Sequence, residues 1–169
     1  MTSRAVLSAG SNIGDSRAHL ASVVAALGDD LRAVSDVYAT PPWGGVEQDD
    51  FANITLIAEA ELTPIQWLEF CWELERAAER VREVRWGPRT LDVDVVAIEV
   101  DGVPVISDDQ TLTLPHPRAR ERAFVLVPWL QIDLEAVLWT PDGVRSVREL
   151  IAEIDGDEVA AVRRTAALS

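Results

Sequence analysis

The sequence predicts an α+β sandwich with an antiparallel or mixed sheet, and three observations indicate it. Segments with the alternating pattern of β-strands are interleaved with segments whose apolar residues recur at helical spacing. Asp101-Gly102 is typical of a two-residue hairpin turn, which joins antiparallel strands. The chain has 169 residues, of which 48% are hydrophobic, so it can bury the core of about one domain. Because it contains no linker or internal repeat, we expect residues 1–169 to form a single domain.

The first half of the chain is expected to hold three strands and two helices. Asp15 is a suitable N-cap for a helix whose apolar residues recur at i, i+3, i+4 and i+7 before Gly28 ends it. Thr63-Pro64 begins a second helix that runs to about residue 80. Strands are expected at residues 4–10, 31–39 and 51–60, with the third following a loop that starts at residue 40.

The second half begins with a strand at residues 90–98. Alternation gives this strand two faces, with Leu91, Val93, Val95 and Ala97 on one and Asp92 and Asp94 on the other. A hairpin leads into residues 103–106, a short strand follows at 111–114, and a short helix is expected near 147–154. The longest apolar stretches, 93–98 and 123–132, are strand-like or are interrupted by Pro128 and Gln131. Neither approaches the roughly 20 residues of a membrane-spanning helix.

Composition excludes several classes of function. The net charge of −14 disfavours nucleic acid or an anionic membrane as a partner, because binding phosphates needs a basic surface. All 15 basic residues are Arg, and the absence of Lys excludes a P-loop and Schiff-base catalysis. The single cysteine, Cys71, excludes an internal disulfide, and two histidines make a structural zinc site improbable. Without an export signal, we expect a cytoplasmic protein.

Asp92-Val93-Asp94 is the sharpest chemical feature of the sequence. Residues two apart in a strand point to the same face, so the two carboxylates converge there. Such a pair is unfavourable unless a cation or a proton lies between them. Mg²⁺ typically binds one or two carboxylates together with phosphates of a substrate. The alternative is a solvated polar face of an edge strand.

Arginines near this pair favour a polyphosphate ligand. Eight of the 15 arginines fall in two short segments, and guanidinium forks suit phosphate oxygens. They are Arg76, Arg80, Arg82, Arg85 and Arg89 in the first segment and Arg118, Arg120 and Arg122 in the second. The alternative is a solubilising surface paired with nearby glutamates, which we favour for Arg76 and Arg85.

Other polar and aromatic residues allow both structural and functional interpretations. Glu75 lies within the apolar arc of its helix and needs a partner there, for which Arg80 and Arg82 are candidates. His116, between two prolines, either caps the core or contacts a phosphate. Phe51 and Asn53 share a strand face and could stack and hydrogen-bond a flat ring. Four tryptophans are expected in or near the core: Trp67, Trp72, Trp129 and Trp139.

Four ordered blocks of the sequence resemble the 6-hydroxymethyl-7,8-dihydropterin pyrophosphokinase family, which acts in folate biosynthesis. They span roughly residues 5–135, and the most specific is the run from Arg85 to Asp94. The blocks are Ser8-Ala9-Gly10-Ser11-Asn12-Ile13-Gly14-Asp15; Thr40-Pro41-Pro42-Trp43-Gly44 with Phe51-Ala52-Asn53; Arg80-Val81-Arg82 with Arg85-Trp86-Gly87-Pro88-Arg89-Thr90-Leu91-Asp92-Val93-Asp94; and Leu114-Pro115-His116-Pro117-Arg118 with Arg122 and Phe124.

The resemblance implies a ferredoxin-like three-layer α/β/α sandwich, a monomer, and transfer of pyrophosphate from ATP to the hydroxymethyl group of the pterin, with release of AMP. It implies that two Mg²⁺ ions are held by Asp92 and Asp94. The implied catalytic residues are Arg80, Arg89, Asp92 and Asp94. The implied pterin-binding residues are Thr40, Pro41, Pro42, Trp43, Phe51, Asn53, Trp86, Asp92 and Phe124. The implied ATP-binding residues are Glu75, Arg80, Arg82, Arg89, Asp94, Val95, Thr113, His116 and Arg122.

Two other functions are compatible with this scaffold. A non-catalytic protein that binds pterin or nucleotide would bind both ligands without turnover, and the complete set of Arg and Asp residues argues against it. A ferredoxin-like RNA-binding domain would use Phe51 and Phe124 as stacking platforms, and the net charge of −14 argues against that.

Overall fold

An antiparallel sheet forms the middle layer of the protein. The structure is a computed structural model that describes residues 1–42, 49–79 and 90–168. The strand order is β11–β3–β4–β1–β5–β6, and β2 pairs with the part of β4 that β3 leaves uncovered. These strands are β1 (Ser3–Ser11), β2 (Leu31–Val34), β3 (Tyr38–Thr40), β4 (Phe51–Ala60), β5 (Asp92–Val100), β6 (Val103–Pro104) and β11 (Arg163–Arg164).

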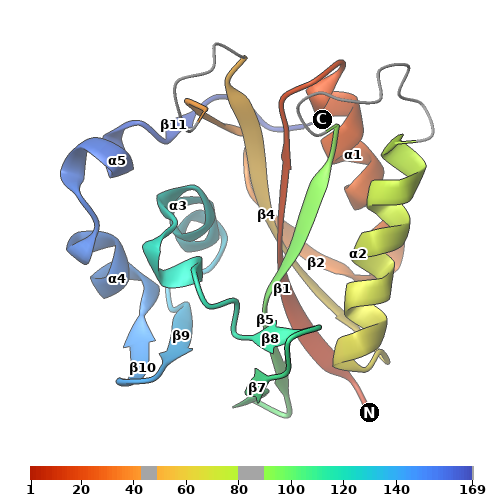
Figure 1. The fold of residues 1–169 in the computed structure, drawn as a ribbon, viewed down its shortest axis with the longest axis vertical. Coiled ribbons are helices and arrows are strands. Elements are labelled where there is room, and N and C mark those ends of the chain that lie inside the picture. The colour runs from red at the N-terminus through yellow and green to blue at the C-terminus, as the bar shows by residue number, and fades with distance from the viewer. Residues whose placement is uncertain (43–48, 80–89, 169) are drawn as a thin grey trace.

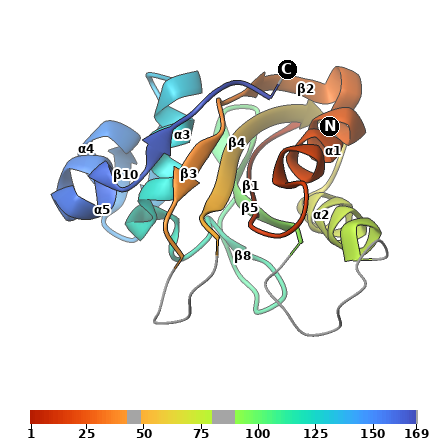
Figure 2. The ribbon, with the colours of Figure 1, turned by 90° about the horizontal axis from the view of Figure 1, so that it is seen from above.

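Helices cover both faces of this sheet (Figures 1 and 2). On one face α1 (Ser16–Leu27) and α2 (Pro64–Glu79) enclose one apolar cluster, and on the other α3 (Ala123–Ile132) encloses a second one together with α4 (Val147–Glu153). The short helix α5 (Gly156–Ala160) lies beyond them. This arrangement confirms the predicted α+β fold, a three-layer α/β/α sandwich around a mainly antiparallel sheet.

Local signals set both ends of α1 and the start of α2 as predicted. The Asp15 side chain accepts a hydrogen bond from the Ala18 N–H at 3.0 Å, and α1 ends at Gly28, whose φ of 52° suits a residue without a side chain. Thr63 and Gln66 form a reciprocal capping box, in which each side chain accepts the other's backbone N–H at 3.2 and 2.9 Å.

The strand predicted at residues 31–39 is wrong in one respect, because β2 and β3 are separate strands. Between them Ser35 exchanges two hydrogen bonds with the Thr55 backbone, one of them through its hydroxyl. Val37 then pairs with the C-terminal segment, where its N–H donates to the Ala166 carbonyl at 2.9 Å. Ser35 therefore stays hydrogen-bonded to β4, and Val37 pairs with the C-terminal segment before β3 rejoins β4 at Tyr38.

The predicted alternation of β5 fails at Ala97. We expected Ala97 on the face of Val95, but Ala97 packs against the cluster under α3 and Val95 against the cluster under α1 and α2. The register explains the change, because Leu7 of β1 pairs with Val95 whereas its neighbour Val6 pairs with Ala97. Val96 is thus the extra residue of a β-bulge, which reverses the faces beyond it.

Helix α3 replaces the strand-like or interrupted segment expected at residues 123–132. Pro128 lies inside this helix, where it removes one backbone hydrogen bond. Val125, Leu126 and Trp129 are buried at helical spacing on the sheet, and this burial outweighs the unfavourable proline.

The remaining elements are short. Asp101 and Gly102 have φ values of 53° and 77° and make the predicted turn between β5 and β6, although β6 ends at Pro104. The other elements are β7 (Ser107–Asp108), β8 (Thr113–Leu114), β9 (Val137–Thr140), β10 (Gly143–Ser146) and the 3₁₀ turns η1 (Gly28–Asp30) and η2 (Ala119–Glu121). Throughout residues 1–42, 49–79 and 90–168, no helix is long and apolar enough to cross a membrane.

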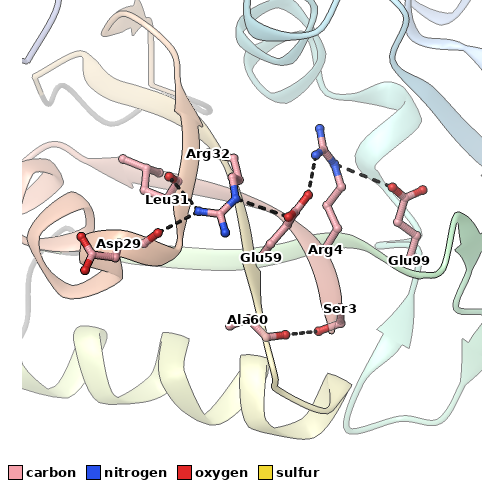
Figure 3. Close-up of polar contacts among 8 residues, drawn as sticks. All are labelled: Ser3, Arg4, Asp29, Leu31, Arg32, Glu59, Ala60 and Glu99. Carbon is pink, nitrogen blue, oxygen red and sulfur yellow. Dashed lines mark hydrogen bonds and ion pairs between the residues drawn. The ribbon is translucent and has the colours of Figure 1, made fainter. Parts of the chain in front are cut away.

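Cross-strand ion pairs stabilise one end of the sheet (Figure 3). This end lies opposite the start of β5, where Asp92 and Asp94 are found. Glu59 of β4 accepts hydrogen bonds from Arg4 at 2.9 Å and Arg32 at 3.3 Å, and Arg4 also lies 3.7 Å from Glu99 of β5. The hydrogen bond from Arg4 contributes most to lowering the pKa of Glu59 below its usual value. These three strands are thereby fixed in register at this end.

Tryptophan burial follows the prediction except at Trp72. Trp67 and Trp129 are 1% and 3% exposed, and Trp139 is half-buried. Trp72 is 43% exposed, which is more than the core or partly buried position expected for it. It follows Trp67 by five residues, which turns it away from the buried side of α2.

Candidate active site

A cavity of about 320 Å³ opens between α2, the start of β5 and residues 111–117. It gathers acidic, apolar and hydroxyl-bearing side chains from three segments that are far apart in the sequence. Its lining residues are Leu68, Trp72, Glu75, Asp92, Val93, Asp94, Val95, Thr111, Leu112, Thr113, His116 and Pro117. The structure therefore brings together six residues predicted as site residues: Glu75, Asp92, Asp94, Val95, Thr113 and His116.

The two carboxylates of β5 lie on one face of the sheet, as their spacing predicted. Asp92 pairs with Gly10 of β1, and Asp94 pairs with Ser8. Both are half-buried, and the Asp94 carboxylate is 3.5 Å from the guanidinium of Arg122. Arg122 precedes α3, so this ion pair joins that helix to the sheet.

These side chains fit a hard divalent cation. Two half-buried carboxylates offer oxygen ligands of the kind that Mg²⁺ prefers. Within the described ranges, no group of three or more His, Cys, Asp or Glu side chains could hold a metal. Mg²⁺ that is held by one or two carboxylates usually takes its other ligands from water and from substrate phosphates.

Glu75 connects α2 to the start of β5 by a hydrogen bond. One of its carboxylate oxygens accepts a hydrogen bond from the backbone N–H of Val93 at 3.0 Å. Among the described residues, β6 pairs with this edge of β5 only at Glu99 and Val100, and no described strand covers it near Val93. Sequence reasoning required a partner for Glu75, and the Val93 amide is one. The candidates it named, Arg80 and Arg82, lie outside the described residues.

His116 presents a neutral imidazole to the cavity. The backbone N–H of His116 donates to the Val96 carbonyl at 2.8 Å, and the ring Nδ1 accepts a hydrogen bond from the backbone N–H of Arg118 at 3.2 Å. The neutral ring therefore carries its proton on Nε2, which can donate to a ligand. Burial lowers the pKa of His116 below 6.5, and the positive charge of Arg122 lowers it further.

The His116 titration is expected to have its midpoint below 6.5, and Arg122→Gln should move it upward because one nearby cation is removed. NMR of the imidazole protons measures both. Arg120→Gln is the control and should leave the midpoint unchanged. Since the folded state resists protonation, the free energy of unfolding should fall as pH decreases through 6.5 towards the lowered pKa. An unchanged midpoint in Arg122→Gln would contradict the electrostatic cause.

A polar row crosses the sheet beside this cavity. Asn53 of β4 pairs with Gly10 of β1, which pairs with Asp92 of β5. Residues paired in antiparallel strands share a face, so Asn53 and Asp92 lie on the same side, about 10 Å apart across two strand spacings. The buried Asn53 amide donates to the Thr40 hydroxyl at 2.8 Å, which holds it in place.

Gly10 keeps the middle of this row open. A Cβ built on Gly10 would lie 2.7 Å from Oδ1 of Asn53, closer than side-chain atoms can approach. Only glycine therefore permits the observed position of the Asn53 amide.

Two aromatic rings border the same side of the sheet. Phe51 pairs with Thr40 at the start of β4, and Phe124 lies in the first turn of α3. Arg122 lies over the Phe124 ring at 5.6 Å from its centre. Within the described part of the chain the one aromatic pair is Trp67 with Phe70, so Phe51 and Phe124 do not stack on each other.

Comparison with known proteins decides the family. The family model described as 7,8-dihydro-6-hydroxymethylpterin-pyrophosphokinase (HPPK) matches residues 6–134. The chain belongs to the HPPK family. It is 48% identical over 166 residues to the 2-amino-4-hydroxy-6-hydroxymethyldihydropteridine pyrophosphokinase of Mycobacterium tuberculosis. The aligned residues cover 95% of this chain and 88% of that protein.

More distant members match as well. The enzyme of the same name from Methylorubrum extorquens is 47% identical over 156 residues, covering 90% of this chain and 94% of its own length. The bifunctional protein FolKE of Lactococcus lactis subsp. lactis is 36% identical over 157 residues, which are 90% of this chain and 42% of that protein.

Several residues implied by the HPPK resemblance lie outside the described residues, and their roles stay predictions. They are Trp43, Arg80, Arg82, Trp86 and Arg89. Of the two prolines before Trp43, Pro41 is exposed and Pro42 is half-buried.

Sequence reasoning missed the apolar wall of the HPPK cavity. The missed residues are Leu68 and Trp72, which line the cavity from α2 two turns and one turn before the predicted Glu75. This spacing was visible in the sequence, but it was interpreted as core because an apolar helical stripe usually faces the interior. The thiol of Cys71 lies between these residues and is fully buried, and burial raises its pKa far above its usual value. It is therefore not a nucleophile.

Proposed function

We propose that this HPPK family member transfers pyrophosphate from ATP to the hydroxymethyl group of 6-hydroxymethyl-7,8-dihydropterin, releasing AMP, in folate biosynthesis. The observation that carries the proposal is the row Asn53–Gly10–Asp92 across the sheet. At one end of the row the Asn53 amide can hydrogen-bond a ligand beside the aromatic rings, and at the other end Asp92 lines the acidic cavity. The separation of about 10 Å matches a pterin that lies on the row with its hydroxymethyl group directed at Asp92.

The pterin end of the proposed site recognises a flat, polar ring. Phe51 and Phe124 would lie on opposite faces of the ring, since they border the same side of the sheet without stacking on each other. Asn53, held by Thr40, would pair with the polar edge of the ring. Pro41, Pro42, Trp43 and Trp86 complete the proposed pterin-binding set.

The nucleotide end is the cavity between α2 and β5. Val95 and Thr113 would border the base. Glu75 would keep α2 in place beside β5 through its hydrogen bond with the Val93 N–H, and the Nε2–H of His116 would donate to a phosphate. Arg122 would bind a second phosphate oxygen. We assign Arg80, Arg82 and Arg89 to the phosphates as well, and Arg80 and Arg89 to the reacting groups.

The proposed reaction is one in-line displacement. The hydroxymethyl oxygen bonds to the β-phosphorus, the bond from that phosphorus to the oxygen bridging to the α-phosphorus breaks, AMP leaves and one proton is released. Asp92 and Asp94 would hold two Mg²⁺ ions, which neutralise phosphate charge and orient the reacting oxygens. The chain's own part is to align the two substrates and to exclude water. In line with the family resemblance, we propose a monomer with a single pyrophosphokinase domain.

The products distinguish this reaction from other phosphate transfers. Incubation with Mg²⁺, ATP and the pterin alcohol, followed by ³¹P NMR, should give AMP and a pterin diphosphate in equal amounts. ADP with a pterin monophosphate would contradict pyrophosphate transfer. Binding of both ligands without turnover would favour a non-catalytic binding protein.

Gly10→Ala is expected to weaken pterin binding by about tenfold or more, because the new methyl group displaces the Asn53 amide. Calorimetric titration with the pterin in the presence of a non-cleavable ATP analogue measures this. The matched control is Gly156→Ala, where a Cβ meets no atom within 4 Å and binding should not change. Equal pterin affinity in wild type and Gly10→Ala would contradict the role given to this row.

A further inference from the structure

Arg122 touches both ends of the proposed site. Its guanidinium is 3.5 Å from Asp94 and lies over the ring of Phe124 at 5.6 Å. The two charged side chains are partly buried, at 27% exposed for Arg122 and 36% for Asp94. Their attraction is therefore screened less than that of a fully exposed pair.

We propose that Arg122 is an internal counter-ion of Asp94, and that it moves away in favour of a divalent cation when a nucleotide phosphate binds the guanidinium. This inference rests on the proposed function of the site. Arg122 is accordingly a positioning residue for Asp94, and its movement makes binding of cation and binding of nucleotide favour each other.

Charge balance is the first argument. Asp92 and Asp94 lie on one face of β5, where two like charges repel each other unless a cation is near. Arg122 supplies that positive charge before any cation binds. A divalent cation that approaches Asp94 without a nucleotide competes with the guanidinium for the carboxylate and also meets its repulsion, so Arg122 weakens binding of the cation by itself.

The second argument is the exchange of partners. A polyphosphate offers the guanidinium more negative charge than one carboxylate and two oxygens for its paired N–H groups. Arg122 sits between η2 and α3 in an extended conformation, with φ −103° and ψ 98°. Its side chain can therefore change partner without unwinding either element. Once it binds the phosphate, the guanidinium no longer competes for Asp94 with the cation that accompanies the nucleotide.

The neighbouring Arg120 offers a matched control. It comes from the same turn, η2, and is 3.7 Å from Asp142, an exposed carboxylate outside the cavity. Arg120→Gln removes the same charge from the same segment but leaves Asp94 with its partner.

The test is titration of the folded protein with Mn²⁺, followed by the electron paramagnetic resonance of free Mn²⁺. Without nucleotide, Arg122→Gln should bind Mn²⁺ about threefold to tenfold more tightly than wild type. Arg120→Gln should match wild type, and Arg122→Lys, which keeps the charge, should return towards wild type. With α,β-methylene-ATP present, wild-type affinity should increase markedly, and Arg122→Gln should show a smaller increase. Equal Mn²⁺ affinity in wild type and Arg122→Gln would overturn the inference.

Asp94→Asn separates failure of this inference from failure of the site. If Asp94→Asn weakens Mn²⁺ binding while Arg122→Gln matches wild type, the metal site stands and the counter-ion role is wrong. If wild type binds Mn²⁺ neither alone nor with the nucleotide analogue, both the proposed site and the inference are overturned.

Discussion

Asp92→Asn and Asp94→Asn are each expected to lower kcat/KM at least about a thousandfold, because charge neutralisation by metal contributes several kcal/mol to such transfers. Asparagine keeps the shape of each side chain and removes its negative charge. Both residues line the cavity from one face of β5, so both variants lose a ligand for the same cations. Steady-state AMP formation over a range of Mg²⁺ concentrations measures the loss.

Asp101→Asn is the matched control for this prediction. Asp101 ends the hairpin turn after the same strand, outside the cavity, and its φ of 53° is one that asparagine adopts readily. This variant should retain wild-type turnover, while thermal unfolding shows that all three variants remain folded. Full turnover in Asp92→Asn or Asp94→Asn would refute the assignment of these carboxylates.

Trp67→Ala is expected to lower the free energy of unfolding by about 3–5 kcal/mol, a large part of the stability of a small domain. Trp67 is 1% exposed, meets Phe70 edge to face at 6.1 Å between ring centres, and donates its indole N–H to the Ser3 hydroxyl at 2.7 Å. Truncation leaves a cavity between α2 and the sheet and removes this donor. Urea unfolding monitored by circular dichroism measures the change.

Two further variants test whether the loss of stability comes from burial of the Trp67 ring. Trp67→Phe retains most of the buried area and loses the hydrogen bond to Ser3, so its cost should be smaller, about 1–2 kcal/mol. Trp72→Ala, on the same helix but 43% exposed, should change stability by less than about 1 kcal/mol. Equal losses in Trp67→Ala and Trp72→Ala would contradict the burial that distinguishes them.

Much of the fold could be predicted where local chemistry decides it. The caps at Asp15 and Thr63 and the turn at Asp101-Gly102 are short-range signals, and each element begins or ends there. The predicted strand at residues 31–39 failed because its interruption depends on the distant Thr55 and Ala166. Helix α3 was missed for the same kind of reason, since its stability with Pro128 inside comes from burial against the sheet.

The site divides in the same way. Strand alternation was enough to put Asp92 and Asp94 on one face, and helical spacing was enough to identify Glu75 as a carboxylate that needs a partner. The ion pair of Asp94 with Arg122 joins residues 28 apart in the sequence and depends on how α3 meets the sheet. No local pattern encodes that contact, and the row through Gly10 likewise exists only once three strands are in register.

Release of AMP from ATP, measured with and without 6-hydroxymethyl-7,8-dihydropterin, tests the central claim most directly. With Mg²⁺ present, AMP should form only when the pterin alcohol is present, and chelation of the metal should stop it. AMP formation that is independent of the pterin, or its absence when both substrates and Mg²⁺ are supplied to the folded protein, would contradict the proposed pyrophosphate transfer.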